Sequence, residues 1–218
     1  MTKNDVLPGM KPKPLLFVIS GPSGSGKGTA LDLIEREFSP TISRSPTYTT
    51  RAPRTGERPG KDYHYVDEKR FYELVAQKEI FEFTRTYNDE LYGSPRCLIN
   101  AEDDGRHLLV ELDFNGFHRL RSISRRKVIG IFVMPPSIEE LSKRILARQP
   151  ETNLDRRLQR VSEQIAHAWS YDYIVLNQDR DEFMRRIRTV VSAELFRLDG
   201  AGFFTENWHT LDVTLTKS

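Results

Sequence analysis

Cysteine is almost absent from this chain, since Cys97 is the single one among 218 residues. That scarcity excludes an internal disulfide and any zinc site built from several cysteines. No apolar run reaches the ~18 residues of a membrane span, and residues 1–14 contain no apolar segment resembling a secretory signal. None of the five histidines has metal-ligand spacing. We therefore expect a protein of the reducing cytoplasm that has no membrane partner.

An excess of one charge is lacking too. The net charge is only +2, although 29% of the residues are charged. A strongly basic nucleic-acid binder is therefore not indicated, and we expect no nucleic-acid partner. With 38% hydrophobic residues, a chain of this length can bury the core of one domain with inserted pieces. The sequence leaves the oligomeric state open.

What the sequence does contain is a glycine-rich loop between a predicted strand and a predicted helix. The apolar run 15–19 predicts a buried strand, and apolar residues recur at helical spacing after position 29. Glycines let backbone N–H groups converge on phosphate oxygens, and the helix that follows begins with unpaired donors. Gly21, Gly26 and Lys27 have the Walker A spacing. The candidate residues for binding ATP are Gly21, Ser23, Gly24, Ser25, Gly26, Lys27, Gly28 and Thr29.

One position of this loop departs from the Walker A pattern. Gly28 stands where the pattern has serine or threonine, and Thr29 follows one place later. A hydroxyl at Thr29 lies about 100° further round the helix, which leaves the binding of Mg²⁺ open. The G-K-G-T form resembles the loops of adenylate and cytidylate kinases. The alternative is a glycine-rich surface turn with a solvated lysine.

A second stretch, 43–66, concentrates positive charge. Arg51, Arg54, Arg58 and Lys61 stand among turn-forming residues, before a short alternating strand that holds Tyr63. Guanidinium groups bind phosphate in two-bond forks, so two arginines three positions apart could hold one phosphate group. The alternatives are a solvated basic loop and a nucleic-acid patch.

The motif T-T-R-A-P-R-T-G-E, followed by G-K-D-Y, resembles guanylate kinase. The resemblance implies that Arg51, Arg54 and Tyr63 hold the phosphate of GMP. It continues through I-F-E-F, L-Y-G-S and E-L-D-F-N-G. The matching positions that would complete the GMP site are Glu82, Tyr92, Ser94 and Asp113.

Guanine chemistry agrees with this assignment. Its N1–H and N2 amino group are adjacent donors, and the carboxylate of Glu82 could accept from both. Adenine lacks this pair of donors, so a buried carboxylate would be left unpaired and adenine would be rejected. Thr47 and Ser94 offer hydroxyls to other base edges. The alternative is that Glu82 is merely the exposed residue of an alternating strand.

Three further buried strands are predicted at 107–112, 127–133 and 173–176. The first ends at Asp113, and ligands of open α/β sheets bind beyond such strand ends. We expect Asp113 and Thr29 to contact Mg²⁺, the cofactor that accompanies ATP, directly or through water. Helices are predicted to begin at Asp67, at Ser94-Pro95, at Ser137 and at Asp181. Cys97 is expected to be a small side chain that fills space in a buried or half-buried position.

Two predicted amphipathic helices, 137–148 and 154–168, flank a short turn. The resemblance implies that they form a lid whose arginines close over ATP and the transferred group. The lid candidates are Arg144, Arg148 and Arg157, and Asn177 is expected near the adenine. The alternative is that these arginines are solvated surface charges.

Together these observations predict an α/β phosphate-loop fold of three layers, with a central parallel sheet, an inserted GMP-binding subdomain and a short helical lid. The predicted activity is ATP-dependent phosphorylation of GMP and dGMP by in-line transfer, with Lys27, Arg51 and the lid arginines as catalytic residues. Two alternatives are a similar kinase for a ribose bisphosphate and a guanylate-kinase-like interaction module. The expected divisions are 1–14 as a flexible leader, 15–46, 97–143 and 161–198 as the core, 47–96 as the GMP-binding subdomain, 144–160 as the lid and 199–218 as an extension of unknown role.

Overall fold

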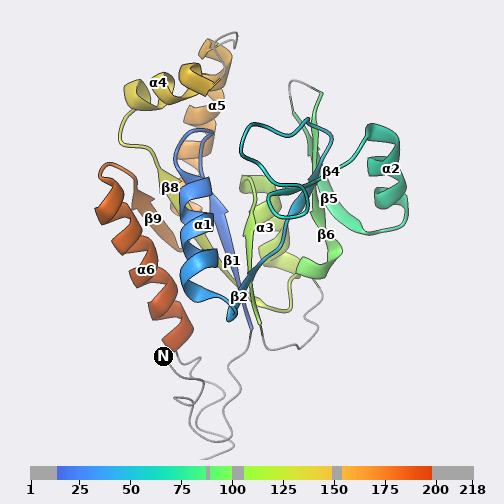
Figure 1. The fold of residues 1–218 in the computed structure, drawn as a ribbon, viewed down its shortest axis with the longest axis horizontal. Helices are drawn as coiled ribbons and strands as arrows, with labels where there is room; N and C mark the ends of the chain where they lie inside the picture. The colour runs from blue at the N-terminus through green and yellow to red at the C-terminus, as the bar shows by residue number, and fades with distance from the viewer. Residues whose placement is uncertain (1–13, 87–88, 100–105, 149–153, 198–218) are drawn as a thin grey trace, which may run out of the picture.

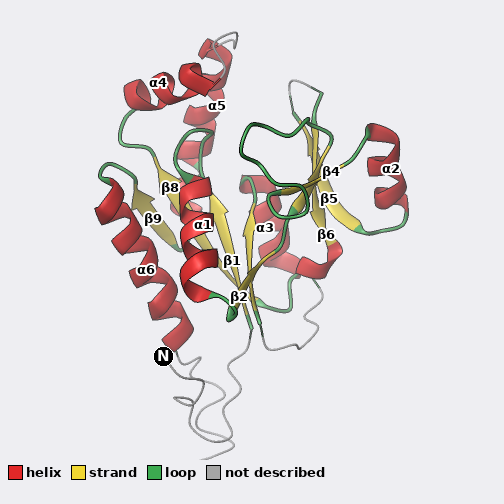
Figure 2. Cartoon of the chain, viewed as in Figure 1, coloured by secondary structure: helices red, strands yellow, loops and turns green. Residues whose placement is uncertain are grey.

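A computed structural model describes residues 14–86, 89–99, 106–148 and 154–197, apart from the side chains of Arg148 and Arg156. Within these described ranges, nine strands form two sheets that lie among helices (Figures 1 and 2). The central sheet has the order β2-β7-β1-β8-β9 with every pairing parallel. Its strands are β1 (Leu15–Ser20), β2 (Ile42–Arg44), β7 (His107–Glu111), β8 (Lys127–Met134) and β9 (Tyr173–Leu176). The predicted central parallel sheet is confirmed.

The middle strand β1 is buried along its whole length. Phe17 lies between Leu109 of β7 and Ile129 of β8, so both edges of β1 are paired. A parallel strand covered on both faces reads as a continuous apolar run, which is why this segment could be predicted from sequence. Complete burial of a side chain such as Phe17 stabilises the fold by about 1.5–3 kcal/mol.

Alternation along β1 divides the core between two layers of helices. Leu15, Phe17 and Ile19 pack in the cluster formed with α1 (Lys27–Phe38) and α6 (Arg180–Phe196). Leu16 and Val18 pack in the opposite cluster, with α3 (Phe114–Ile123). In Figure 1, α1 and α6 lie in front of the central sheet and α3 lies behind it. The carboxyl ends of the strands are therefore left open for a site.

The second sheet is inserted between β2 and β7 in the chain and lies to the right of the central sheet in Figure 1. Its order is β4-β3-β6-β5, with α2 (Glu68–Ala76) packed on it. Asp67 caps α2 as predicted, since its Oδ1 accepts from the N–H of Arg70 at 2.7 Å. The strands are β3 (Thr47–Thr49), β4 (Tyr63–Tyr65), β5 (Ile80–Arg85) and β6 (Leu91–Pro95).

Helices α4 (Ile138–Arg148) and α5 (Leu154–Ala166) form a pair above the loop that joins β1 to α1 (Figure 1). Leu141, Ile145 and Val161 make a small core between them. The Oγ of Ser137 accepts from the N–H of Glu140 at 3.1 Å, as the predicted capping box requires. A methyl group placed on Gly24 would lie 3.2 Å from Leu141, so α4 rests directly on the glycine-rich loop.

Three expectations are wrong in detail. Ser94 and Pro95 end β6 instead of beginning a helix, and only the short 3₁₀ turn η1 (Arg96–Leu98) follows. The N–H of Arg96 donates to the carbonyl of Glu79 at 2.8 Å, so pairing beside β5 outweighs the local start signal. The last helix begins at Arg180 and not at Asp181, because the side chain of Asp179, one residue before the helix, caps it by accepting from the N–H of Glu182 at 2.9 Å. Cys97 is exposed.

A second 3₁₀ turn, η2 (Ala168–Ser170), joins α5 to the segment before β9. None of the helices that the structure describes combines the length and the apolarity needed to cross a lipid bilayer. The predicted extension 199–218 lies outside the described residues.

Candidate active site

The loop between β1 and α1 is held open by glycines in the left-handed region. Gly21, Gly24 and Gly26 have φ values of 140°, 86° and 107°. Side chains are strained there, whereas glycine is not. Helix α1 begins at this loop with no capping side chain and no acidic residue in its first turn. Its first N–H groups are therefore available to an anion.

Lys27 lies across the loop. Its Nζ donates to the carbonyls of Gly21 and Pro22 at 2.8 and 3.0 Å, and it forms an ion pair with Glu111 at 3.5 Å. Glu111 is not among the site residues predicted from sequence. Its position at the end of β7, the strand beside β1, is the signal that could have identified it.

Asn177 supports the same loop from the end of β9. Its Nδ2 donates to the carbonyl of Ser25 at 2.7 Å, and a methyl group on Gly26 would lie 2.1 Å from that nitrogen. Asn177 also lines a hollow of about 360 Å³ together with Thr29, Arg144, Arg180 and Phe183. The structure therefore brings the loop, the start of α1, α4 and α6 together, as an ATP site requires.

The two predicted metal contacts, Thr29 and Asp113, lie in different surroundings. Thr29 is exposed at the hollow just described, whereas Asp113 caps α3 by accepting from the N–H of Gly116 at 2.8 Å. The described residues contain no cluster of three or more acids, histidines or cysteines that could hold a metal ion. Mg²⁺ in kinases needs only one or two protein oxygens besides phosphates and waters. The hydroxyl of Thr29 and the carboxylates of Glu111, the last residue of β7, and of Asp113, two residues further on, fit that donor set.

Arg51 is enclosed by fixed partners and is 7% exposed. Its Nη1 and Nη2 each donate to a carboxylate oxygen of Glu57 at 2.9 Å, its Nε donates to the hydroxyl of Tyr92 at 2.9 Å, and Nη1 also donates to the carbonyl of Ala52 at 2.7 Å. Four of the five N–H groups of the guanidinium are thus bonded within the described part of the chain. The second N–H of Nη2 is the one group of the guanidinium without a partner among the described residues.

Glu57 is the last residue of the motif T-T-R-A-P-R-T-G-E but is not among the site residues predicted from sequence. It also accepts from the N–H of Arg54 at 2.8 Å and from the hydroxyl of Tyr65 at 2.7 Å. Burial acts to raise the pKa of Glu57, but the hydrogen bonds from Arg51, Arg54 and Tyr65 outweigh it and lower the pKa to about 2. Glu57 is therefore an ionised anchor for the whole loop.

Two aromatic rings lie beside Arg51, the partner of this anchor. The ring of Tyr63 lies 5.3 Å from the guanidinium carbon of Arg51 and meets Tyr92 edge to face, with 6.0 Å between ring centroids. Burial raises the pKa of both tyrosines, so both hydroxyls remain neutral, and the hydroxyl of Tyr92 donates to Glu90 at 3.4 Å. Arg54 stands exposed on the same loop. These are the residues that the sequence assigned to the acceptor phosphate.

The predicted base-binding residues lie on the second sheet and at α3. Ser94 donates to Glu82 at 2.5 Å, and a methyl group on Gly116 would lie 3.0 Å from the same carboxylate. Burial raises the pKa of Glu82, the bond from Ser94 lowers it and nearby Asp113 raises it. Thr47 is buried on β3, where it pairs with Tyr63 of β4. Glu82 is half-buried and turned toward α3, so the alternative of a merely exposed strand residue is wrong.

Among the lid candidates, Arg144 lies beside the loop. A methyl group on Gly24 would be 3.6 Å from the Cβ of Arg144, whose Nε is 3.1 Å from Glu140. Arg157 is half-buried on α5. The side chain of Arg148 and the turn 149–153 lie outside what the structure describes.

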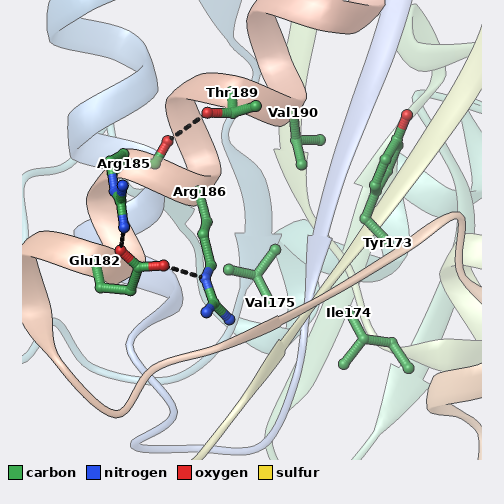
Figure 3. A pocket seen from close by; sticks show the side chains of 8 residues that line it. All are labelled: Tyr173, Ile174, Val175, Glu182, Arg185, Arg186, Thr189 and Val190. Atoms are coloured by element: carbon green, nitrogen blue, oxygen red, sulfur yellow. Dashed lines mark hydrogen bonds and ion pairs between the residues drawn. The ribbon is translucent and has the colours of Figure 1, made fainter.

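Another hollow, of about 340 Å³, lies between β9 and α6 (Figure 3). Figure 3 shows Glu182 paired with both Arg185 and Arg186 at its rim, and Val175 and Val190 inside. No predicted site residue lines it, and its charged groups are already paired with one another. It is separate from the site built on the loop and Arg51.

The fold and this site define a class: a phosphate-loop kinase that acts on nucleotides. The comparison with known families is more specific, because the family model described as guanylate kinase matches residues 13–194. The chain belongs to the guanylate kinase family.

Individual relatives agree with this assignment. The chain is 37% identical over 194 residues to a guanylate kinase of Paramagnetospirillum magneticum, covering 87% of this chain and 89% of that protein. It is 36% identical over 189 residues to one of Bradyrhizobium diazoefficiens, with 85% of each covered. The crystal structure of guanylate kinase from Anaplasma phagocytophilum superposes with a TM-score of 0.69 at 33% identity, covering 86% of this chain and 89% of that one. The predicted enzyme class is confirmed, and the ribose-bisphosphate kinase and interaction-module alternatives are not favoured.

Proposed function

We propose that the chain transfers the γ-phosphoryl group of ATP to GMP and dGMP, with the acceptor phosphate held beside Arg51, Arg54, Tyr63 and Tyr92. The observation that supports this most directly is that Tyr63 and Tyr92 gather beside the guanidinium of Arg51, which is fixed in place by Glu57. Phosphate oxygens are the acceptors that suit such donors.

Within this cluster, Arg51 and Arg54 have different tasks. Arg51 is buried and almost fully bonded, so it supplies a rigid positive centre. Arg54 is exposed, and its side chain is the arm that closes on the incoming phosphate. A phosphate oxygen of GMP is already anionic, so transfer needs positioning and neutralisation of charge but no general base.

The donor side is the loop from Gly21 to Gly26 with Lys27. On binding ATP, Lys27 exchanges the carbonyls of Gly21 and Pro22 for phosphate oxygens, while Glu111 keeps its ammonium group in the site. Mg²⁺ bound with ATP would meet Thr29 and the carboxylates Glu111 and Asp113, and it supplies neutralisation of charge on the phosphates.

Base selection is assigned to Glu82, with Ser94 and Thr47 beside it. Ser94 fixes one carboxylate oxygen of Glu82, so the group is oriented before guanine arrives. The lid arginines Arg144, Arg148 and Arg157 are assigned to the moving phosphoryl group. Closure of α4 and α5 over the loop would keep water from receiving that group. Asn177 is assigned to the adenosine end, and the reducing cytoplasm stays our expectation for the setting.

The experiment that tests this proposal is a coupled assay of ADP formation from ATP with GMP, dGMP, AMP, CMP and UMP. We expect turnover with GMP and dGMP at least a hundredfold above the other acceptors, because a carboxylate left unpaired in the base site penalises the wrong base. Equal rates with AMP and GMP would contradict the role of Glu82.

A further inference from the structure

Arg44 is a buried arginine that lies outside the proposed nucleotide sites. Arg44 ends β2, and its side chain is only 8% exposed. Burying an unpaired cation is strongly unfavourable, so its partner matters. Arg44 Nη1 lies 2.9 Å from Asp62 and 3.6 Å from Asp32, whose side chains are 14% and 59% exposed. Asp62 is therefore the main partner.

Asp62 closes the turn that leads into Tyr63. Its Oδ2 accepts from the N–H of Arg58 at 2.7 Å, and its own N–H donates to the carbonyl of Arg58 at 2.9 Å. Gly60 permits the turn with a φ of 74°, and its N–H donates to the carbonyl of Tyr63 at 2.8 Å. Tyr63 follows Asp62 directly, so the place of this turn fixes the place of the tyrosine.

The same turn is tied to helix α1 by more exposed pairs. Lys61 lies 3.0 Å from Glu35, and Arg58 lies 3.9 Å from Asp32. Exposed pairs of this kind contribute little to stability singly. Both acids stand on α1, the helix that begins with Lys27 of the phosphate loop.

We propose that Arg44 and Asp62 are positioning residues for the acceptor phosphate. Their ion pair holds the turn 58–62 against β2, and Lys61 and Arg58 extend this hold to α1. Tyr63 is thereby kept at a set distance from the loop that carries the donor phosphates. This inference rests on the proposed acceptor site, because Tyr63 must contact the GMP phosphate for its position to matter.

The test compares Arg44→Met/Asp62→Asn with the unaltered protein in steady-state kinetics. Removing both charges leaves no unpaired buried ion, so the fold should persist. We expect KM for GMP to rise about tenfold, the equivalent of 1.4 kcal/mol, with KM for ATP within about twofold. Arg44→Gln alone should give the same rise, because either change breaks one shared interaction.

Arg188→Gln is the matched control. Arg188 pairs with Glu37, also on α1, at 2.6 and 2.8 Å, but it reaches the helix from α6. Its loss should leave KM for GMP unchanged. Lys61→Gln/Arg58→Gln removes only exposed charges, so it should fold whatever happens to the buried pair, and we expect a two- to threefold rise in KM for GMP.

Two results would overturn the inference. One is an unchanged KM for GMP in any folded variant of this set other than the control. The other is an equal rise in KM for ATP and GMP, which would indicate general loosening of the fold. Absence of GMP turnover by the unaltered protein would instead contradict the proposed function itself.

Discussion

Glu57 grips the guanidinium of Arg51 with both carboxylate oxygens, each 2.9 Å from a nitrogen. The pair stands in the loop assigned to the acceptor phosphate, yet Glu57 occupies two N–H groups of Arg51 that a phosphate could otherwise bind. Its effect is to fix Arg51 in one orientation before substrate binds. Such preorganisation lets the charge act without reorganisation when the phosphate arrives.

We expect Glu57→Gln to raise KM for GMP about 10- to 100-fold, with little change in ATP affinity, because Arg51 loses its orienting fork. The substitution should also alter acid stability. An unperturbed glutamate titrates near 4.5 and Glu57 near a pKa of about 2, so the ionised carboxylate stabilises the fold fully above pH 4.5, and this contribution is lost as the pH falls toward 2. Unfolding followed by circular dichroism from pH 6 to 2 should show a smaller loss in Glu57→Gln. If the unaltered protein and Glu57→Gln lost the same stability between pH 6 and 2, the role of Glu57 as an anchor would be refuted.

Arg54→Ala should raise KM for GMP about 100-fold and leave ATP binding nearly unchanged, because Arg54 is the exposed arm of the acceptor loop and makes no part of the donor loop. Calorimetry with each nucleotide separates the two affinities. Arg96→Ala, another exposed arginine of the same inserted segment, serves as the control and should bind GMP normally. Normal GMP phosphorylation by Arg54→Ala would sink the assignment.

Glu82→Gln should lower kcat/KM for GMP by roughly 10²–10⁴, because a neutral amide cannot accept from both guanine donors without turning an N–H toward one of them. The pH dependence is a second signature. Burial raises the pKa of Glu82 above the ordinary value, and guanine needs the ionised form, so KM for GMP should rise as the pH is lowered toward that raised pKa. The Gln variant should lack this limb of the profile. If KM for GMP rose in the same way at low pH in both proteins, the titrating group would be a residue other than Glu82.

The elements with strong local signals could be predicted from sequence. The run around Phe17 is apolar because β1 is covered on both faces, and Asp67 caps α2 within one turn of the chain. The helix expected at Ser94-Pro95 failed for a different reason, since the competing pairing with β5 involves Glu79, which is distant in sequence. A local preference for helix is overridden where the backbone can instead extend the hydrogen-bonded pairing of a sheet.

In the site, too, some residues could be predicted from local sequence and others could not. Residues carried by motifs, such as Arg51 and Tyr63, could be named because their spacing is fixed in the chain. The pairings of Lys27 with Glu111 and of Arg44 with Asp62 could not, because each joins segments whose approach depends on the whole fold. Sequence indicates which groups a loop offers; the fold decides which of them are already occupied.

Gly26→Ala should abolish ATP binding or weaken it more than tenfold. A methyl group there would lie 2.1 Å from Asn177 Nδ2, and the residue has a φ of 107° that alanine rarely adopts. Gly28→Ala is the matched control two positions on, since nothing lies within 4 Å of an added methyl group. Inside α1 it should stabilise the fold by about 0.5–1 kcal/mol. Thermal unfolding and ATP calorimetry distinguish the pair, and equal behaviour of the two would contradict the loop geometry.

The substitution Gly28→Ser tests whether glycine in place of the serine or threonine of the Walker A pattern alters the requirement for Mg²⁺. The space around Gly28 is open, so a serine can enter without displacing a neighbour, and its hydroxyl would stand where the pattern places a ligand of Mg²⁺. Thr29 lies instead at the hollow shared with Arg144 and Asn177. We expect Gly28→Ser to reach half-maximal velocity at a several-fold lower Mg²⁺ concentration, with KM for GMP unchanged because the acceptor loop is untouched. Thr29→Val, measured alongside, should change the Mg²⁺ requirement less in the Gly28→Ser background than in the original chain. If Gly28→Ser leaves the Mg²⁺ titration unmoved while Thr29→Val shifts it strongly, then Thr29 alone supplies the hydroxyl despite its different position on the helix.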